Sequence, residues 1–384
     1  MEKKHIALLY GGTSPEHEIS VLSAKGVFCA IDGTRYDVTP IGIDRQGRWW
    51  LGQPGQAPDA STFPSAYQVM LLPGGRGEAL ALHQATGQAK AIRFDVVLPI
   101  LHGTGGEDGS VQGVLETANV PYVGSGILAS AVCMDKQVTK VLLRDAGLPI
   151  ARFITATRVN APDHAAIRKA LGGDTFFIKP ARLGSSIGIS RVSDEASLRS
   201  ALALAFELDD KVIIEERIGG REIECGVLQT GSDDLLATWP SEIALVSNAH
   251  AFYTYEAKYT DPEAVRLDVR ADVDEDCAQR VQDISRIAFR VLGCEGMARV
   301  DFFLTPSGEL LINEVNTIPG FTPHSMYPRM LGAAGVPYPL LLDTLLEQAF
   351  SRVNAQPAPA TEPWKPGCFG SADPLSADDR GNGV

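Results

Sequence analysis

Residues 299–316 of the chain read RVDFFLTPSGELLINEVN, which is the most informative segment of the sequence. Two apolar runs flank a turn-forming segment at residues 305–308, which predicts a β-hairpin with a four-residue loop. In that register Asp301 lies opposite Ile312 and is a diagonal neighbour of Glu314, about 7–8 Å away. The pairing therefore places two carboxylates close together on one face of the hairpin.

Asn316 extends this acidic face, because side chains two residues apart on a strand point to the same side. Asp301, Glu314 and Asn316 then offer the oxygen ligands that Mg²⁺ prefers when it also binds nucleotide phosphates. The solvated face of an edge hairpin with an Arg299–Glu314 cross-strand pair would show the same alternation. However, residues 317–325 form a Gly- and Pro-rich loop with polar groups that suit a substrate carboxylate, and a purely structural strand end has little use for such a loop. We therefore expect a metal site here.

A second Gly-rich segment follows a predicted buried strand that ends in Lys179. The loop Gly184-Ser185-Ser186 is not a Walker loop, since GxxxxGK[ST] does not occur in the chain. A short Gly/Ser loop between two strands can still present backbone N–H groups and hydroxyls to phosphate oxygens, while the strand-end lysine supplies positive charge. Taken alone, the loop fits a tight hairpin turn equally well.

Further nucleotide contacts are predicted along an apolar strand that ends in Glu215 and Glu216. The polar end of this strand can pass an adenine and give it backbone hydrogen bonds, and Glu222 can then reach the ribose hydroxyls. Lys136 and Lys258 are candidates for phosphate binding, although an isolated lysine is more often a surface charge.

The order of apolar runs predicts three successive units. Up to about residue 124, strand-like runs alternate with helical patterns, which is typical of a parallel α/β unit. In this unit the strands are expected at residues 6–10, 38–43 and 96–100, the helices at 14–30 and 110–118, and edge hairpins at 48–51 and 79–93.

The rest of the chain predicts two α+β units and a tail. One unit has a helix at 134–146, strands at 176–179, 187–192 and 212–216, and a helix at 195–205; the next has strands at 222–228, 235–240, 299–304 and 310–315, and a helix at 273–292. After residue 354, Pro, Ala, Gly and Asp dominate, which predicts disorder. The expected domains are therefore an α/β substrate-binding domain (1–133), a central domain (134–220), a C-terminal domain (221–353) and a disordered tail (354–384).

Composition excludes several classes of protein. The chain has 384 residues, which exceeds the usual size of a single core, and its 45 % apolar and 21 % charged residues are ordinary for a globular protein. A net charge of −13 disfavours nucleic acids and anionic membranes as partners. No apolar run approaches the ~18 residues of a membrane span. Six cysteines show no metal-ligand spacing, so we expect reduced thiols in a cytoplasmic protein.

Together these segments resemble the ATP-grasp superfamily, in which two α+β units clamp ATP and a preceding α/β domain helps to bind substrate. Within it, six motifs are similar in order and spacing to those of the D-alanine:D-alanine ligase family. They are GGTSPEHE (11–18), HGTGGEDG (102–109), MDK (134–136), KP (179–180) with GSS (184–186), YEAKY (255–259) and NEVNTIPG (313–320). The resemblance covers about residues 4–346. It implies ATP-dependent joining of two D-alanine molecules through an acyl phosphate, for peptidoglycan precursor synthesis, by a homodimer.

The resemblance also implies a set of ligand contacts. ATP would be bound by Lys136, Lys179, Ser186, Glu215, Glu216, Ile218, Glu222 and Lys258. Two Mg²⁺ ions, replaceable by Mn²⁺, would be held by Asp301, Glu314 and Asn316, and a role for a monovalent cation stays open. At Glu216 this chain departs from several relatives that have lysine or glutamine, so only the backbone contact is carried over.

Glu16 would bind the ammonium group of the first D-alanine. Its alternative role is to begin a helix, because Thr13 and Glu16 fit a capping box and Ser14-Pro15 fits a cap followed by the first helical position. Glu16 can serve both purposes, since this helix start follows a strand end.

The other substrate contacts come from distant parts of the chain. Ser185 and Tyr259 would join Glu16 in a hydrogen-bonded group that closes the site. Ser325 and Lys258 would hold the carboxylate of the second D-alanine. His102 is a substrate-binding candidate, although a single loop histidine is more often a local hydrogen-bond partner.

These residues imply a mechanism in two steps. The first carboxylate attacks the γ-phosphorus, while lysines and metal ions neutralise the transferring phosphoryl group. The second amine then attacks the acyl phosphate, and Arg299 with the Gly320 backbone N–H stabilises the tetrahedral oxyanion. A lid at residues 247–260 would close to exclude water.

Three alternatives remain open from the sequence. A D-alanine:D-lactate ligase would use the same chemistry, but Tyr259 argues against it because such relatives usually lack this tyrosine. Another ATP-grasp carboxylate:amine ligase would differ only in its acceptor. A non-catalytic nucleotide-binding protein would have no need to keep Arg299 together with the acidic face of the hairpin.

Overall fold

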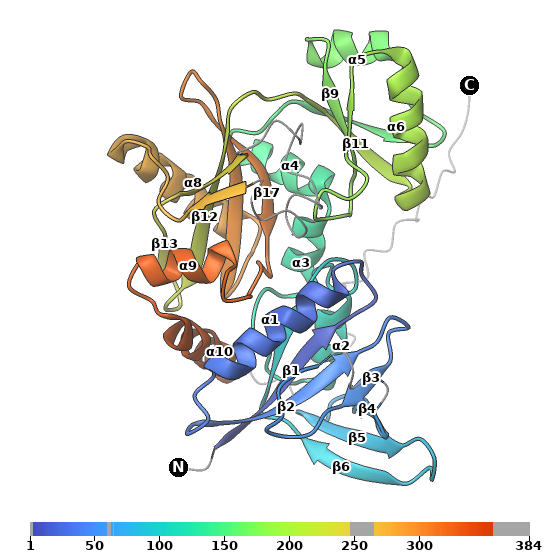
Figure 1. The fold of residues 1–384 in the computed structure, drawn as a ribbon, viewed down its shortest axis with the longest axis vertical. Helices are drawn as coiled ribbons and strands as arrows, with labels where there is room; N and C mark the ends of the chain where they lie inside the picture. The colour runs from blue at the N-terminus through green and yellow to red at the C-terminus, as the bar shows by residue number, and fades with distance from the viewer. Residues whose placement is uncertain (1–2, 60–62, 64, 246–264, 356–384) are drawn as a thin grey trace, which may run out of the picture.

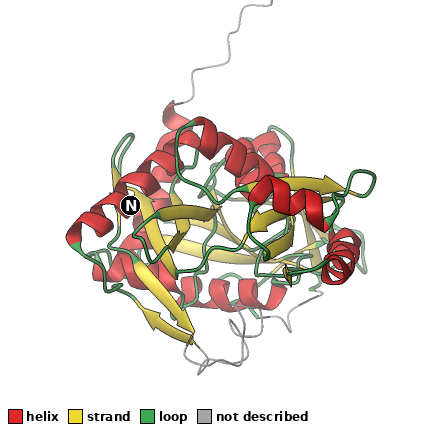
Figure 2. Cartoon of the chain, turned by 90° about the horizontal axis from the view of Figure 1, so that it is seen from above, coloured by secondary structure: helices red, strands yellow, loops and turns green. Residues whose placement is uncertain are grey.

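The computed structural model describes residues 3–59, 63, 65–245 and 265–355 and contains three sheets that follow one another along the chain (Figure 1). The seven-stranded sheet belongs to the N-terminal part, a four-stranded sheet to the middle, and a six-stranded sheet to the C-terminal part. Seen from above, helices lie around the strands (Figure 2). The predicted order of one parallel α/β unit and two α+β units is confirmed.

The N-terminal sheet has a parallel core extended by antiparallel strands. Its order is β6-β5-β4-β3-β2-β1-β7, and β1 pairs in parallel with β2 and β7. The strands are β1 Lys4–Gly11, β2 Tyr36–Ile43, β3 Trp49–Leu51, β4 Tyr67–Leu71, β5 Glu78–His83, β6 Ala89–Arg93 and β7 Val96–Leu101. The predicted strands and edge hairpins are therefore confirmed, and β4 was missed.

Both faces of β1 are buried, which explains its continuous apolar run. Ile6 and Leu8 pack with α1 (His17–Ala30) and with the C-terminal helix α10 (Tyr338–Ala355). Ala7 and Leu9 pack on the other side with α2 (Ser110–Ala118). The last helix of the described chain thus completes the core of the first sheet.

The four-stranded sheet has the order β10-β9-β11-β8. Its strands are β8 Phe153–Thr157, β9 Phe176–Pro180, β10 Ser190–Val192 and β11 Lys211–Glu216, and its helices are α5 His164–Leu171 and α6 Glu195–Leu208. The predicted strand at 187–192 is wrong at its start. Ile187 and Ile189 instead donate their N–H groups to Gly184 and Ser186, so the Gly/Ser loop is longer than expected.

The six-stranded sheet has the order β15-β14-β12-β16-β17, with β13 paired to β12. Its strands are β12 Arg221–Gln229, β13 Leu235–Ala237, β14 Ser241–Leu245, β15 Val265–Asp268, β16 Met297–Leu304 and β17 Leu310–Asn316. Around it lie α3 Ile127–Met134, α4 Lys136–Asp145, α8 Glu275–Val291 and α9 Met326–Ala333. Leu143 of α4 shares the buried core of this sheet with Val300 and Ile312.

The hairpin formed by β16 and β17 is confirmed, but its predicted register is wrong. Asp301 pairs directly with Glu314 rather than with Ile312, and Arg299 pairs with Asn316 rather than with Glu314. The two carboxylates are therefore direct cross-strand neighbours, which brings them closer than the diagonal placement that was expected.

Two local features cause this change of register. The loop has five residues, because Thr305 donates its N–H to the carbonyl of Glu309 at 2.9 Å. A β-bulge then inserts Asn313 between the Phe302–Ile312 and Asp301–Glu314 pairs. A bulge adds one residue to one strand and re-aims the side chains beyond it.

Within residues 3–59, 65–245 and 265–355, none of the helices combines the length and the apolar character that a membrane span requires. The five cysteines in that part of the chain are free thiols, as expected. The predicted tail lies outside the described residues from residue 356 onward.

Candidate active site

A cavity of about 450 Å³ is lined by residues from the N-terminal, middle and C-terminal parts of the chain, and its strand residues belong to the six-stranded sheet. Seven predicted site residues line it: Glu16, His102, Ser185, Arg299, Asn316, Gly320 and Ser325. Two further carboxylates, Glu107 and Glu224, also line it. The cavity therefore collects the residues to which substrate binding or oxyanion stabilisation was assigned.

Glu16 connects the N-terminal part of the chain to the Gly/Ser loop. The Ser185 hydroxyl donates a hydrogen bond to the Glu16 carboxylate across the cavity. α1 begins at His17, and Glu16 makes no side-chain capping bond, so the predicted Thr13–Glu16 capping box is wrong. The Ser14 hydroxyl instead accepts the Glu16 N–H at 3.2 Å, which leaves the carboxylate directed toward the loop.

The Gly/Ser loop has an unusual backbone that fits a binding role. Ser185 and Ser186 have φ values of 51° and 59°, in the left-handed region that non-glycine residues rarely adopt. Such strained positions concentrate at ligand sites. The same loop accepts an ammonium group, since Lys136 donates to the Leu183 carbonyl at 2.6 Å.

His102 is held by protein groups on both sides of its ring. Nε2 lies 3.2 Å from the Ser23 hydroxyl, and Nδ1 lies 3.2 Å from the Ile318 carbonyl. Burial lowers the pKa of His102, although the nearby Glu16 carboxylate opposes this. The imidazole thus favours its neutral form and fixes the loop after β17 against α1.

Glu107 was quoted in the sequence motif but was not selected as a site residue. Its carboxylate accepts the N–H of Gly103 at 2.7 Å and that of Ile318 at 3.2 Å. Burial, together with the negative charge of Glu16, raises the pKa of Glu107 to about 8. Its position in a Gly-rich loop directly after a buried strand was the available signal.

We expect this carboxyl group to make stability depend on pH. Because its folded pKa lies above the ordinary value of 4.5, Glu107 favours folding while it is protonated, and this contribution is lost as pH rises toward 8. Glu107→Gln should therefore flatten the fall in melting temperature between pH 5 and pH 8.5. Asp108→Asn controls for loss of a charge from the same loop, and parallel curves for wild type and Glu107→Gln would contradict the prediction.

Arg299 organises the acidic face of the hairpin. Its guanidinium donates two hydrogen bonds of 2.7 Å to Asp301 and lies 3.2 Å from Glu224. Burial alone would lower the pKa of Arg299, but the Asp301 and Glu224 carboxylates hold it well above its ordinary value. Asn316 Nδ2 also donates to Asp301 at 2.9 Å. The predicted metal ligands and the predicted oxyanion donor thus form one contiguous row.

The side chains of this row suit a divalent cation. Asp301 and Glu314 are direct cross-strand neighbours and Asn316 lies two residues beyond Glu314, so all three offer oxygen atoms on one side of the hairpin. In the described ranges, no three His, Cys, Asp or Glu side chains form a complete metal site by themselves. A cation would therefore need further oxygen ligands, and nucleotide phosphates are suitable ones.

Two lysines that were predicted to bind phosphate, Lys136 and Lys179, lie close to the hairpin. Lys136 Nζ lies 3.6 Å from Glu314, and Lys179 Nζ lies 3.3 Å from the side-chain oxygen of Asn313. Lys179 Nζ also lies 2.5 Å from the Glu215 carboxylate. Four predicted residues, Lys136, Lys179, Glu215 and Glu314, are thus brought together.

The side chains of Glu215 and Glu216, at the end of the predicted adenine strand, are held by basic residues. The buried Glu215 carboxylate is an ion-pair partner: burial would raise its pKa, but Lys140 and Lys179 lower it to about 2. The Glu216 carboxylate accepts hydrogen bonds from Arg152, and its N–H donates to the Arg152 carbonyl at 3.1 Å. Both carboxylates therefore contact basic side chains, and neither belongs to the row of predicted metal ligands.

Three further residues were predicted to bind ATP, and the structure gives their locations. Ile218 is half-buried in the otherwise exposed loop after β11, and Ser186 lies beside Ser185. Glu222 lines a small space of about 30 Å³ together with Glu224 and Asp301. Their contacts with nucleotide stay predictions.

The loop after β17 brings Ser325 against Gly320. A Cβ atom on Gly320 would lie 2.9 Å from the Ser325 hydroxyl oxygen, so glycine permits the close approach. The same hydroxyl accepts the Thr322 N–H at 3.1 Å and lies 2.7 Å from the Thr322 hydroxyl. The predicted carboxylate-binding hydroxyl is therefore held in the cavity wall.

Lys258, Tyr259 and the predicted lid at residues 247–260 lie outside the described residues. Their proposed contacts consequently stay predictions.

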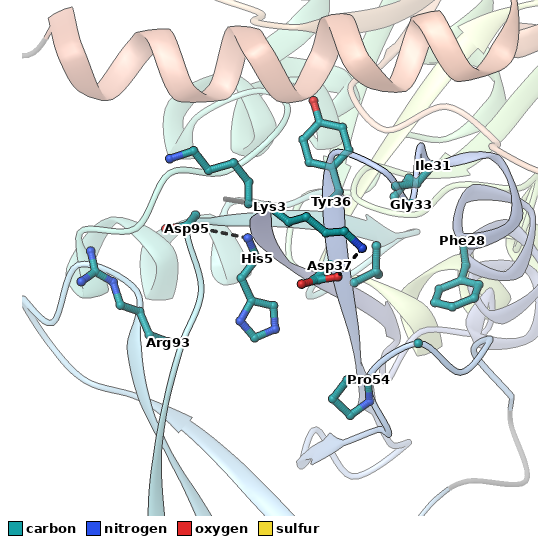
Figure 3. A pocket seen from close by; sticks show the side chains of 13 residues that line it. Lys3, His5, Phe28, Ile31, Gly33, Tyr36, Asp37, Pro54, Arg93 and Asp95 are labelled. Atoms are coloured by element: carbon teal, nitrogen blue, oxygen red, sulfur yellow. Dashed lines mark hydrogen bonds and ion pairs between the residues drawn. The ribbon is translucent and has the colours of Figure 1, made fainter. Parts of the chain in front are cut away.

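A larger cavity of about 1090 Å³ contains none of the predicted site residues (Figure 3). It lies at the amino-terminal ends of the parallel strands, where Lys3 pairs with Asp37 and the His5 N–H donates to Asp95. Glu16 and His102 follow the carboxyl-terminal ends of those strands. The two cavities are thus at opposite ends of the first sheet, and only the smaller one gathers the candidate chemistry.

Comparisons with known proteins agree with this geometry. Residues 5–125 match the family model "D-ala D-ala ligase N-terminus", and residues 142–347 match "D-ala D-ala ligase C-terminus". The D-alanine--D-alanine ligase A of Mesorhizobium japonicum is 49 % identical, over 92 % of this chain and 99 % of that protein. The enzyme of the same name from Escherichia coli K12 is 46 % identical, over 93 % and 99 %.

Solved structures give the same result. The D-alanine-D-alanine ligase from Coxiella burnetii has a TM-score of 0.80 and 38 % identity, covering 92 % of this chain and 96 % of that chain. The VanG D-Ala:D-Ser ligase from Enterococcus faecalis also has a TM-score of 0.80 and 38 % identity, covering 91 % and 100 %. The predicted fold class is thereby confirmed.

Proposed function

The chain belongs to the D-alanine:D-alanine ligase family and is an ATP-dependent ligase of two D-alanine molecules, and on this premise we propose how its residues divide the work. Residues 1–133 act as the substrate-binding domain, 134–220 as the central ATP-grasp domain and 221–353 as the C-terminal ATP-grasp domain. The product, D-alanyl-D-alanine, supplies peptidoglycan precursor synthesis.

The observation that carries this proposal is the arrangement around the cavity. Glu16, Ser185, Arg299 and Asn316 all line it; Ser185 donates to Glu16, and Asn316 and Arg299 both donate to Asp301. A substrate between them would meet an anionic site for its ammonium group and cationic groups for a developing oxyanion.

In the first step, a carboxylate oxygen of the first D-alanine attacks the γ-phosphorus of ATP, and the bond to the β-phosphate oxygen breaks. Glu16 binds the ammonium group of this substrate, and His102 supports the loops beside it. Lys136, Lys179 and Lys258 contact the phosphates and offset their charge. Asp301, Glu314 and Asn316 would hold two Mg²⁺ or Mn²⁺ ions, which supply charge neutralisation for the phosphoryl group when bound.

In the second step, the amine of the second D-alanine attacks the acyl carbon, loses a proton, and inorganic phosphate leaves. Ser325 and Lys258 hold the carboxylate of this substrate. Arg299 and the Gly320 N–H stabilise the tetrahedral oxyanion, and Tyr259 closes the site with Ser185 and Glu16. Along the adenine strand, the backbone of Glu215, Glu216 and Ile218 binds the base.

The experiment that tests this function is phosphate release from ATP with different amino and hydroxy acids. D-alanine alone should support release and yield the dipeptide, whereas L-alanine should not. As acceptors beside a low concentration of D-alanine, D-lactate and D-serine should be used with a kcat/KM at least about 100-fold lower, since specificity reflects differential transition-state binding. Equal use of D-lactate would overturn the substrate assignment.

We also propose that the protein is a cytoplasmic homodimer, as its family resemblance implies. Leu128 of α3 is 77 % exposed and lies beside the exposed Ile127, an apolar feature that a partner subunit could cover. Light scattering across a dilution series measures the oligomeric state, and a monomer at micromolar concentration would contradict the proposal. The same preparation allows K⁺ to be tested as an activator.

A further inference from the structure

A buried lysine that no part of the proposed mechanism uses lies behind the phosphate lysines. Lys140 is 1 % exposed, and its Nζ lies 2.7 Å from one oxygen of the Glu215 carboxylate. The other oxygen of that carboxylate lies 2.5 Å from Nζ of Lys179. One buried carboxylate therefore bridges two ammonium groups, only one of which was predicted to bind ATP.

The fold places this group of three charges between the second and third sheets. Lys140 comes from α4, Glu215 from β11 and Lys179 from β9. Lys140 Nζ also lies 3.5 Å from the carbonyl oxygen of Ile312 on β17. Because Lys136 precedes Lys140 by four residues, both project from one face of α4. The same helix therefore supplies Lys136, which lies near Glu314 of the hairpin, and Lys140, which forms an ion pair with Glu215.

The charges of these three side chains explain why two lysines are present. A buried carboxylate is stable only when other charges compensate it. If Lys179 were its sole partner, the two would form a neutral pair and Lys179 would attract a phosphate less strongly. With Lys140 in place, the group of Lys140, Glu215 and Lys179 carries a net charge of about +1. The excess positive charge then remains available on the side facing the hairpin.

We propose that Lys140 is a positioning residue for ATP, which compensates Glu215 so that the charge of Lys179 stays directed at the nucleotide phosphates. This inference rests on the proposed function, because it takes Lys179 to be a phosphate ligand. Glu215 in turn fixes the Lys179 ammonium, so Lys140 acts on the nucleotide through two other side chains and does not touch it.

The main test replaces Lys140 by Met, which keeps the length of the side chain but removes the charge. We expect K140M to weaken calorimetric binding of ADP in the presence of Mg²⁺ by roughly 10- to 100-fold, as loss of an outer partner of a binding group typically does. The KM for ATP should rise in parallel, while the KM for D-alanine stays within about threefold. K140R should recover most of the affinity, because it restores the charge. K169M removes an exposed lysine from α5 and should change neither quantity.

A double variant separates charge compensation from packing. K140M/E215Q removes the buried anion together with its partner, so Lys179 again carries an uncompensated charge. It should bind ADP several-fold more tightly than K140M, whereas a purely structural role of Lys140 predicts binding no tighter than that of K140M. Melting temperatures establish that each variant is folded. Should K140M not fold, the double variant decides: ADP affinity within roughly tenfold of wild type supports the inference, and a loss as large as that of K179M overturns it.

K179M, measured in parallel, distinguishes failure of this inference from failure of the proposed function. If K179M binds ADP normally, the placement of Lys179 at the phosphates is wrong and the inference falls with it. If K179M binds weakly but K140M binds normally, the proposed function stands and the role of Lys140 is overturned.

Discussion

Glu314→Gln is expected to reduce ATP-dependent formation of D-alanyl-D-alanine by roughly 10³-fold, because losing a metal ligand removes several kcal/mol of transition-state stabilisation. Glu314 is the direct cross-strand neighbour of Asp301, and its carboxylate lies 3.6 Å from Lys136. Glutamine keeps the size of the side chain but offers one neutral oxygen instead of two charged ones. The fold should survive, since the Glu314 side chain is 23 % exposed and its ion pair is long.

The measurement is coupled phosphate release at saturating ATP and D-alanine, with calorimetric titration of Mn²⁺ in the presence of ADP as a second readout. Glu309→Gln is the matched control, because Glu309 is an exposed glutamate in the loop of the same hairpin. It should retain full activity. Wild-type turnover by Glu314→Gln, or unchanged Mn²⁺ binding, would remove the metal site from the mechanism.

Arg299→Lys is expected to lower kcat by about 10²- to 10³-fold, the usual effect of losing one donor to a developing oxyanion. Lysine keeps the positive charge but cannot make the two parallel hydrogen bonds that Arg299 gives to Asp301. The KM for ATP should change little, because the cavity places Arg299 with Gly320 and Ser325 rather than with the phosphate lysines.

A second substitution at this position separates catalysis from stability. Arg299→Met leaves Glu224 and Asp301 without their shared cation, and breaking a buried ion pair typically costs about 3–5 kcal/mol of stability. It should therefore lower the melting temperature as well as kcat. Arg280→Lys is the control, because the Arg280 guanidinium donates to the Gly308 carbonyl in the hairpin loop and Arg280 does not line the cavity. Unaltered kcat in Arg299→Lys would contradict the oxyanion role.

Much of the fold could be predicted because periodicity reports directly on burial. The run of residues 6–10 is apolar on both faces, and it forms the middle one of the three parallel strands, where the sheet is covered on both sides. The helix at 110–118 was predicted with the bounds that α2 has. Short elements such as β4 and β14 were missed because a few residues of alternating character do not differ from loops.

The site was predicted less completely, for two physical reasons. The position of Asp301 relative to Glu314 depends on a bulge at Asn313, and a bulge has no reliable sequence pattern. Lys140 became visible only through its environment, since a helical LysxxxLys spacing does not say which charge will be buried, and the Gly-rich loop marked Glu107 by its position but not by its burial. Glu16 and Ser185, which the structure brings together at the cavity, were predicted from motif resemblance rather than from periodicity.

The packing of α10 against β1 has a consequence for how the protein is made. One apolar face of the first sheet, which includes Ile6 and Leu8, receives part of its cover from Leu341, Leu342 and Leu345. During synthesis these late residues leave the ribosome after nearly all of the chain has been made. Until then, the apolar face of the first strand stays partly exposed to solvent. Nascent chains with such surfaces are the ones that aggregate or recruit chaperones.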